Sequence, residues 1–454
     1  MLIRFAIKNL FSFKDETEFN LLPGRVKRLN QHKYEINGIE ILKLSAIYGA
    51  NGSGKSNLIR SISLLKMMLL NGTIPSDFNN QKFKLSKSNL NEPVELAIEF
   101  FANNSIYYYS VSINNGIIID EAFSSNGKDQ EDQLIFHRKF ENNKTSISFF
   151  KEFEDVIENQ TLKTVIEKDL LKPYQPLFTL LNSISNTAFI DIRVAYNWFN
   201  VGLTIIFPST KPNSLAHQID SKVGFKEFAN DLMCSFNTGI ASLKVEVKSI
   251  EEFFGEDNQT DIDEIKSDLK NNPEKIILRK IKTENEEIVI VNENGKIIAK
   301  RLFFEHKGEK NENVEFKLNE ESDGTRRLLE YLPAWNELIN NSPTFIIDEI
   351  ERSIHPLIIK ELVEKFSKDE STKGQLIFST HESNLLDQEV FRTDEIWFTE
   401  KNLLGSTKLY SLSDFKEHNT IDIRKGYLNG RYGAIPFLGN LQDLNWHKFQ
   451  DEKK

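Results

Sequence analysis

One segment has the residue types and spacing of a phosphate-binding loop. It reads Gly49-Ala50-Asn51-Gly52-Ser53-Gly54-Lys55-Ser56 and matches the pattern G-x-x-x-x-G-K-[ST]. Glycines let backbone N–H groups face a phosphate, and the start of a following helix adds partial positive charge. In such loops the lysine reaches the β- and γ-phosphates and the hydroxyl residue ligates Mg²⁺. The residues expected to contact a nucleoside triphosphate are Gly49, Asn51, Gly52, Ser53, Gly54, Lys55, Ser56 and Asn57.

A second segment supplies the carboxylates that such a site needs. Thr344-Phe345-Ile346-Ile347-Asp348-Glu349 is an apolar run that ends in two acids, as a Walker B strand does. We expect Asp348 to hold the Mg²⁺ shell, because a hard cation prefers oxygen ligands. Glu349 would polarise the water that attacks the phosphate. A strand that merely ends in a polar turn is the alternative, and the phosphate-binding loop in the same chain favours the functional interpretation.

The next apolar run ends in a histidine. It reads Leu376-Ile377-Phe378-Ser379-Thr380-His381. At the end of a strand beside a phosphate site, a histidine can donate a hydrogen bond to the γ-phosphate and register its loss. We expect this role for His381, with a purely structural role as the alternative.

A further anion-binding element is predicted at Ser322-Asp323-Gly324-Thr325, which precedes a helix beginning near Arg326. Small residues and exposed N–H groups at a helix N-terminus attract anions. Two such elements in one chain are hard to bring to one phosphate, so we expect a partner subunit to supply Ser322, Gly324 and Thr325. An ordinary helix cap by Ser322 or Asp323 stays open as the alternative.

The elements that must position these residues alternate between strand and helix patterns. Apolar residues at 41–48 predict a buried strand before the loop, and residues 57–65 predict a helix after it. Residues 94–101 alternate apolar and polar side chains, and with residues 106–113 they predict an antiparallel meander. Residues 287–291, followed by Asn292-Glu293-Asn294-Gly295, predict a hairpin. The fold class expected is α/β, a nucleotide-binding lobe with an inserted region.

Four segments are expected along the chain. Residues 1–150 would carry the loop and the meander, and residues 151–275 a mainly helical insertion broken by prolines. Residues 276–400 would complete the nucleotide-binding head, and residues 401–454 would form a tail that contacts a partner. The length of 454 residues is too great for one ordinary core, which agrees with two or three lobes.

Composition narrows the class of protein. Hydrophobic residues make up 39% of the chain and charged residues 27%, and Cys234 is its one cysteine, so an internal disulfide and a cysteine-based zinc site are excluded. No run approaches the roughly 20 apolar residues that span a bilayer, so we expect a cytoplasmic protein without a membrane segment. The net charge of −10 argues against coating nucleic acid, because phosphate binding draws on clustered lysine and arginine.

In the order and spacing of these motifs, the chain resembles the ABC-class head ATPases of the RecF, SMC and OLD kind. The resemblance covers residues 1–120 and 285–400 and implies ATP and Mg²⁺ as ligands. It also implies heads that dimerise face to face, with Ser322 and Gly324 of one subunit at the γ-phosphate of the other. Gln81 is the candidate for the family's metal-contacting glutamine. Phe11 stands where many relatives carry a basic residue, for which Lys14 could compensate.

The C-terminal part, with Asp394-Glu395-Ile396-Trp397-Phe398 and Gly426-Tyr427-Leu428-Asn429-Gly430-Arg431-Tyr432-Gly433, resembles small ATPases of bacterial abortive-infection systems, such as AbiL-like and PARIS-like ones. This resemblance implies a sensor or scaffold of an anti-phage system, a separate nuclease-like effector of the TOPRIM or RloB type, and a phage protein as trigger. Too few residues follow Glu400 for the TOPRIM domain that OLD nucleases carry. The alternatives are a RecF-like DNA-binding repair ATPase and a nuclease with a metal site in the middle region.

Overall fold

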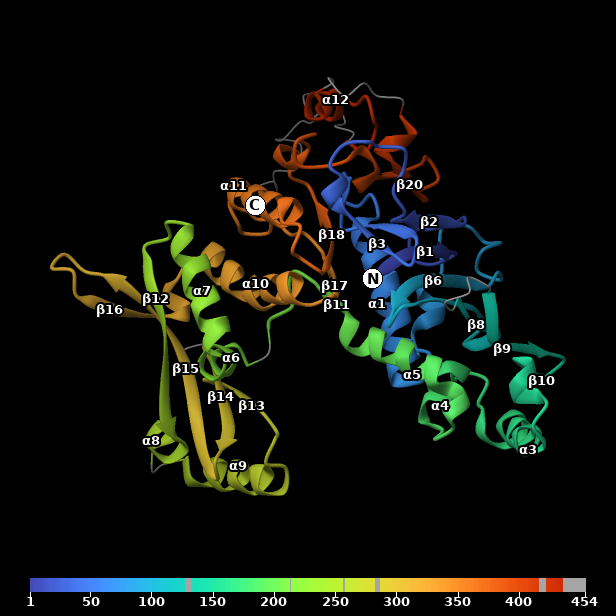
Figure 1. The fold of residues 1–454 in the computed structure, drawn as a ribbon, viewed down its shortest axis with the longest axis horizontal. Coiled ribbons are helices and arrows are strands. Elements are labelled where there is room, and N and C mark those ends of the chain that lie inside the picture. Colours follow the sequence, from blue (N-terminus) through green and yellow to red (C-terminus); the bar gives the residue numbers. More distant parts are fainter. Residues whose placement is uncertain (127–131, 213, 256–257, 282–285, 416–421, 436–454) are drawn as a thin grey trace, which may run out of the picture. The chain divides into compact units, whose positions relative to one another are not determined.

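The computed structural model describes residues 1–126, 132–212, 214–255, 258–281, 286–415 and 422–435 (Figure 1). The chain divides into two compact units. Unit 1 contains Met1–Ile205, Ile346–Asp348 and the residues from Gln375 onward, and unit 2 contains Ile206–Phe345 and Glu349–Gly374. The middle segment expected at residues 151–275 is therefore shared, with residues 151–205 in unit 1 and residues 206–275 in unit 2.

The sheet that carries the phosphate-binding loop has six strands, in the order β11-β17-β18-β5-β19-β20. Strand β5 lies at its centre, parallel to β18 on one side and to β19 on the other, and β20 is antiparallel to β19. Every residue of β5 and β18 is buried, which agrees with their mainly apolar sequences. The strands are β5 (Leu44–Gly49), β11 (Leu203–Ile206), β17 (Thr344–Ile347), β18 (Gln375–Thr380), β19 (Ile396–Lys401) and β20 (Thr407–Ser411).

A second sheet of unit 1 has seven antiparallel strands, in the order β10-β9-β8-β7-β6-β1-β2. Strands β6 to β10 follow one another in the chain and in space, so the predicted meander is confirmed and is longer than expected. The strands are β1 (Leu2–Lys8), β2 (Thr17–Asn20), β6 (Val94–Ala102), β7 (Ser105–Asn114), β8 (Ile117–Asn126), β9 (Asp132–Glu141) and β10 (Lys144–Phe149); a separate hairpin has β3 (Lys33–Ile36) and β4 (Ile39–Leu42).

The helices of unit 1 are α1 (Lys55–Asn71), α2 (Lys151–Glu154), α3 (Ile157–Val165), α4 (Leu177–Ser183), α5 (Ile190–Asn197) and α12 (Ile423–Leu428). A buried ion pair joins the meander to α4: Glu121 lies 3.3 Å from Arg138 and accepts hydrogen bonds from the N–H groups of Leu177 and Phe178. Burial raises the pKa of Glu121, and Arg138 counteracts that rise. The carboxylate thus satisfies N–H groups that the first turn of α4 leaves without helical partners.

Unit 2 contains a sheet in the order β12-β15-β14-β13, with β16 also paired to β15. The predicted hairpin is confirmed as β14 and β15, and Asn294 and Gly295 at its turn have φ of 53° and 80°. Both values suit a two-residue turn of type I′. The strands are β12 (Ile240–Ser249), β13 (Ile277–Ile281), β14 (Glu286–Glu293), β15 (Lys296–Lys307) and β16 (Asn313–Lys317).

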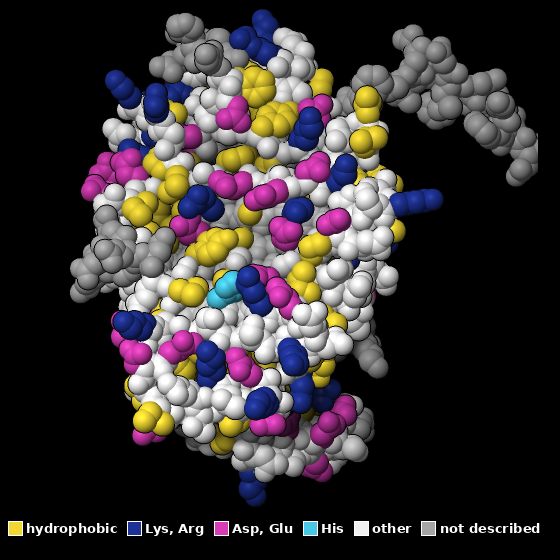
Figure 2. Space-filling model, turned by 90° about the vertical axis from the view of Figure 1, so that its right-hand side faces the viewer, with side chains coloured by type: hydrophobic (Ala, Val, Ile, Leu, Met, Phe, Trp, Pro, Cys, Tyr) yellow, Lys and Arg dark blue, Asp and Glu magenta, His cyan; other side chains and the backbone are white. Residues whose placement is uncertain are grey.

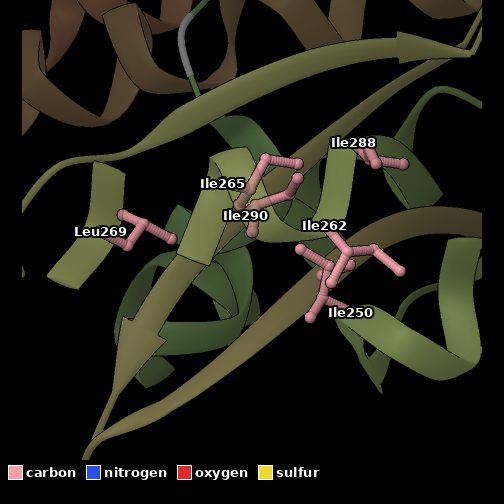
Figure 3. Packing of buried hydrophobic residues seen from close by; sticks show 7 residues of the cluster. Ile250, Ile262, Ile265, Leu269, Ile288 and Ile290 are labelled. Carbon is pink, nitrogen blue, oxygen red and sulfur yellow. The ribbon is translucent and has the colours of Figure 1, made fainter. Parts of the chain in front are cut away.

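Helices α8 and α9 cover part of this sheet. Ile250 of α8 and Ile262, Ile265 and Leu269 of α9 are buried in one cluster with Ile288 and Ile290 of β14 (Figure 3). The apolar spacing of α9 places these side chains on one helical face. The helices of unit 2 are α6 (Leu215–Ser221), α7 (Val223–Ser235), α8 (Ile250–Phe254), α9 (Gln259–Asn271), α10 (Asp323–Asn340) and α11 (Pro356–Lys368).

The fold class is mixed α/β, as expected from the sequence. Within the described ranges, no helix combines the length and the apolar character that crossing a membrane requires.

Candidate nucleotide site

The phosphate-binding loop connects β5 to α1, which is the strand–loop–helix arrangement predicted for it. Gly52 and Gly54 have φ of 76° and 122°, values that residues with a side chain rarely adopt. A Cβ on Gly54 would also lie 2.7 Å from Cγ2 of Thr407. Gly49 packs as closely, since its Cβ would lie 2.6 Å from the carbonyl oxygen of Thr399. The glycines of the motif are thus required by backbone conformation and by close packing.

Lys55 begins α1 with its side chain buried. Its Nζ donates hydrogen bonds to the carbonyl oxygens of Gly49 at 2.7 Å and Ala50 at 3.2 Å. The same nitrogen lies 3.3 Å from Nδ1 of His381, the residue that follows β18. The structure therefore brings together the lysine and the histidine that the sequence pattern singled out.

Ser56 and Asp348 meet at the other side of the loop. Ser56 Oγ donates to Asp348 Oδ1 at 3.1 Å, and Ser379 Oγ donates to the same carboxylate oxygen at 2.6 Å. Asp348 is 3% exposed and directly follows β17. A hydroxyl and a carboxylate oxygen at this spacing are ligands of the kind that Mg²⁺ takes, usually together with waters and phosphate oxygens. The donor set therefore fits Mg²⁺, and Ser56 and Asp348 are the residues that would hold it.

Two threonines of the β19–β20 hairpin support the loop from behind, and sequence reasoning missed both. Thr399 Oγ1 lies 2.6 Å from Ser53 Oγ. Thr407 Oγ1 contacts the carbonyl oxygen of Ser53 and Oγ of Ser12, both at 2.7 Å. Asn57, expected at the nucleotide, donates to Ser12 Oγ at 2.8 Å. Both threonines lie within strands, which is a signal that they could have a specific partner. Only the strand register shows that this partner is the phosphate-binding loop.

The residues just before β19 are held in place by buried interactions between charged or titratable side chains. Arg392 donates to both carboxylate oxygens of Asp394, at 2.9 and 2.7 Å. His32 Nδ1 lies 3.0 Å from Glu395, and both side chains are fully buried. Burial raises the pKa of Glu395, and the hydrogen bond with His32 counteracts that rise. These pairs hold the start of the strand that brings Thr399 to the loop.

Gln81 lies elsewhere in unit 1. It ends a short 3₁₀ helix, Phe78–Gln81, and its Nε2 donates to Asp77 at 2.9 Å. Its backbone oxygen accepts from Phe11 N at 2.7 Å, and in the described part of the chain no contact joins its side chain to Ser56 or Asp348. Asn51 is exposed at the tip of the loop. The structure thus does not gather Gln81 with the other expected metal ligands.

The remaining expected residues belong to unit 2. Glu349 follows Asp348 directly, and its φ of 53° is uncommon for a residue with a side chain. Ser322 caps α10, because its Oγ accepts from Thr325 N at 3.1 Å. A Cβ on Gly324 would lie 2.7 Å from the carbonyl oxygen of Ser353. The predicted cap by Ser322 is therefore present, and Gly324 is required for packing against the turn that follows Glu349.

Comparison with known protein families gives one match that covers most of the chain. The family described as "AAA domain, putative AbiEii toxin, Type IV TA system" matches residues 44–188 and 241–387. The first range includes the phosphate-binding loop, and the second includes Ser322, Asp348 and His381. No match was found among curated proteins.

Solved SMC heads are similar to the chain over most of its length, at low identity. The SMC head bound to the C-terminal winged-helix domain of ScpA is 14% identical with a TM-score of 0.43, covering 90% of this chain and 97% of that chain. The SMC head domain from Thermotoga maritima is 12% identical with a TM-score of 0.35, covering 90% and 98%. The Smc head from Pyrococcus furiosus, with an extended coiled coil and the C-terminal domain of ScpA, is 13% identical with a TM-score of 0.38, covering 95% and 98%.

Proposed function

Because the chain belongs to the AAA domain family described above, we propose that it binds ATP with Mg²⁺, hydrolyses it, and uses the nucleotide to control the assembly of its copies. The observation that carries this proposal is the convergence of Ser56 and Asp348, 3.1 Å apart, beside the loop that holds Lys55. Phosphoryl transfer to water needs positioning and charge stabilisation more than covalent chemistry. These residues offer both.

Each polar group of the site has a role in the proposed reaction. Lys55 binds the β- and γ-phosphates, and Ser56 and Asp348 hold Mg²⁺, which neutralises developing negative charge. Glu349 orients and polarises the attacking water. His381, 3.3 Å from Lys55, donates to the γ-phosphate and loses that contact after hydrolysis. Gln81 would have to leave Asp77 before it contacted the metal.

Assembly follows in this proposal from the second anion-binding element. Ser322, Gly324 and Thr325 at the start of α10 contact the γ-phosphate bound by a partner subunit, so ATP stabilises a head-to-head dimer. Ser322 and Gly324 lie at a helix N-terminus, and Ser322 is exposed, which supports this role. Nucleotide controls assembly only if it binds the assembled and separate states unequally.

We assign this cycle to a sensor or scaffold in bacterial defence against phage, which controls a separate nuclease-like effector and responds to a phage protein. The family description, which names a toxin of a toxin–antitoxin system, supports a role in conflict between cell and phage. A neighbouring gene for a TOPRIM-like or RloB-like protein is the expected finding. A repair gene at that position would contradict the defence role without affecting ATP hydrolysis.

The test combines ATP turnover with native mass measurements. Lys55→Ala should abolish ATP binding and assembly, and Glu349→Gln should bind ATP, stop turnover and accumulate the assembled form. Glu361→Gln, at an exposed position of α11, is the matched control and should behave as wild type. If all four proteins show one oligomer with and without ATP, nucleotide-controlled assembly is wrong.

If the chain is instead a RecF-like DNA-binding ATPase, the same purified proteins should give a different result. Such an ATPase should bind duplex DNA only with ATP, and this binding should weaken steeply as the salt concentration rises. On the face that Figure 2 shows, lysine and arginine side chains are interspersed with aspartate and glutamate, without a broad basic patch. The net charge of −10 leads us to expect weak DNA binding, and salt-sensitive binding in the presence of ATP would favour the repair role.

A further inference from the structure

Unit 2 contains a cavity of about 230 Å³ that none of the roles above uses. Its apolar wall comes from four elements of that unit. Leu215 and Ala216 belong to α6, Val289 and Leu302 to β14 and β15, and Leu329 to α10. A concave site lined mainly by apolar side chains, with a few polar groups, is the usual form of a small-molecule pocket.

The charges around this cavity leave one excess positive charge. Lys211, Lys280 and Arg326 line it together with Glu287 and Glu330. Arg326 pairs with Asp323, and Glu330 pairs with Arg327 at 2.9 Å, so these charges are compensated.

Two lysines and one carboxylate remain. Burial raises the pKa of Glu287, and the positive charges of Lys211 and Lys280 act against that rise. Among the described residues that line the cavity, the two lysines therefore share one acidic neighbour, Glu287. A ligand that brings a second negative charge would complete the charge balance.

The wall from α6 is held in place by a buried lysine. The side chain of Lys300 on β15 is fully buried and lies 2.5 Å from Asp220, which belongs to α6. The same Nζ pairs with Glu293 and lies 3.3 Å from Nδ1 of His217 on α6. A buried charge is retained only when it is paired, so these contacts tie α6 to the sheet and keep the cavity open. The cavity is preformed.

We propose that this cavity binds a small organic anion, with an apolar body against Leu215, Val289 and Leu302 and an acidic group beside Lys211 and Lys280. Its volume of about 230 Å³ suits the body of a fused-ring acid. The ligand would touch Leu329 and Arg326, in the first turns of the helix that begins beside Ser322.

Isothermal titration of the full chain, without nucleotide, tests this proposal with 2-naphthoate and its neutral analogue 2-naphthalenemethanol. We expect naphthoate to bind about fivefold more tightly than the alcohol, since each partly exposed ion pair contributes modestly. The double variant Lys211→Met/Lys280→Met should remove this preference. The matched control Lys226→Met/Lys310→Met, at exposed positions of the same unit, should retain it.

Ala216→Phe should fill the cavity and abolish binding of both probes, and circular dichroism should show that this variant is folded. Repeating the titration with Lys55→Ala separates the cavity from the nucleotide site, because naphthoate binding should be unchanged. The proposal is overturned if naphthoate shows no binding at millimolar concentration, if acid and alcohol bind equally, or if the Lys211/Lys280 variant keeps the preference. Should Ala216→Phe unfold, the lysine variants still decide the outcome.

Discussion

The phosphate-binding loop and the Ser322 segment both lie at helix N-termini, and we propose that both bind phosphate, yet different contacts hold them in place. The loop depends on side chains that are remote in sequence, Ser12, Thr399 and Thr407. The segment at Ser322 depends on its own helix and on the carbonyl oxygen of Ser353. The loop thus depends on side chains from both ends of the sequence of unit 1, whereas the Ser322 segment has its cap within its own helix and packs on one turn of unit 2. The first suits a tight nucleotide site, and the second suits a surface offered to a partner.

The largest effect expected from this comparison is that of Gly54→Ala. The new Cβ would overlap Thr407 at a φ of 122°, so strain and overlap together cost about 3 kcal/mol or more. ATP affinity, measured by titration, should fall about a hundredfold. Gly52→Ala is the control within the same loop, because a Cβ there has open space and only the backbone cost of about 1–2 kcal/mol applies. Equal losses for both variants would contradict the role of Thr407.

Gly324→Ala should have the next largest effect and should act differently. Overlap with the backbone oxygen of Ser353 costs about 2 kcal/mol, seen as a lower melting temperature. ATP binding by the separate subunit should remain, while ATP-driven assembly should be lost. Gly224→Ala in α7, where a Cβ meets no neighbour, should change stability by no more than about 1 kcal/mol. A Gly324→Ala protein that loses ATP binding would mean that the two elements are not independent.

Thr407→Val tests the remote support by removing one buried hydroxyl while keeping the shape. Oγ1 of Thr407 joins Ser12 to Ser53, so its loss should cost about 1.5 kcal/mol and weaken ATP binding several-fold. Thr407→Ser keeps the hydroxyl and should retain most of the affinity. Chemical denaturation and nucleotide titration measure the two effects. Unchanged ATP affinity in the valine variant would show that the loop does not need this support.

The smallest effect is expected for Ser322→Ala, which removes the cap of α10 at a cost of about 1 kcal/mol. Ser322→Asp separates the cap from the proposed phosphate contact. An aspartate caps a helix as well as serine does, but its charge repels the γ-phosphate of a partner. Thermal stability should therefore persist in the aspartate variant while assembly fails. Assembly that survives this substitution would rule out the phosphate contact.

The sequence predicted the parts of the site that form within one motif. The loop around Lys55, the acid Asp348 and the histidine after β18 were all named from local patterns, and the structure brings them together. Ser379 was missed, although a serine in an otherwise apolar strand was a visible signal. Thr399 and Thr407 could not be assigned, because their contacts with the loop depend on the register of β19 against β5 and of β20 against β19.

The fold, like the site, could be predicted from the sequence only where the interacting residues are close along the chain. The meander and the β14–β15 hairpin were predicted because neighbouring strands pair across short turns. The pairing of β12 with β15 joins residues 49 to 66 positions apart, and β5 lies between two strands from the C-terminal part of the chain. Alternation and apolar content identify a strand, but they do not select its distant neighbour. The sequence therefore predicted the elements better than it predicted the pairing of distant strands.

The position of Thr399 and Thr407 late in the chain has a consequence for biosynthesis. Residues 49–56 are made early, but the hairpin that supports them emerges from the ribosome only after most of the protein has been translated. Domains generally fold as units during synthesis. We therefore expect the nucleotide site of unit 1 to reach its folded form only when β20 is present. A chain interrupted before β20 would contain the complete loop motif and lack the supports that we expect tight ATP binding to need. We therefore expect a nascent chain to bind nucleotide tightly only after β20 has been translated.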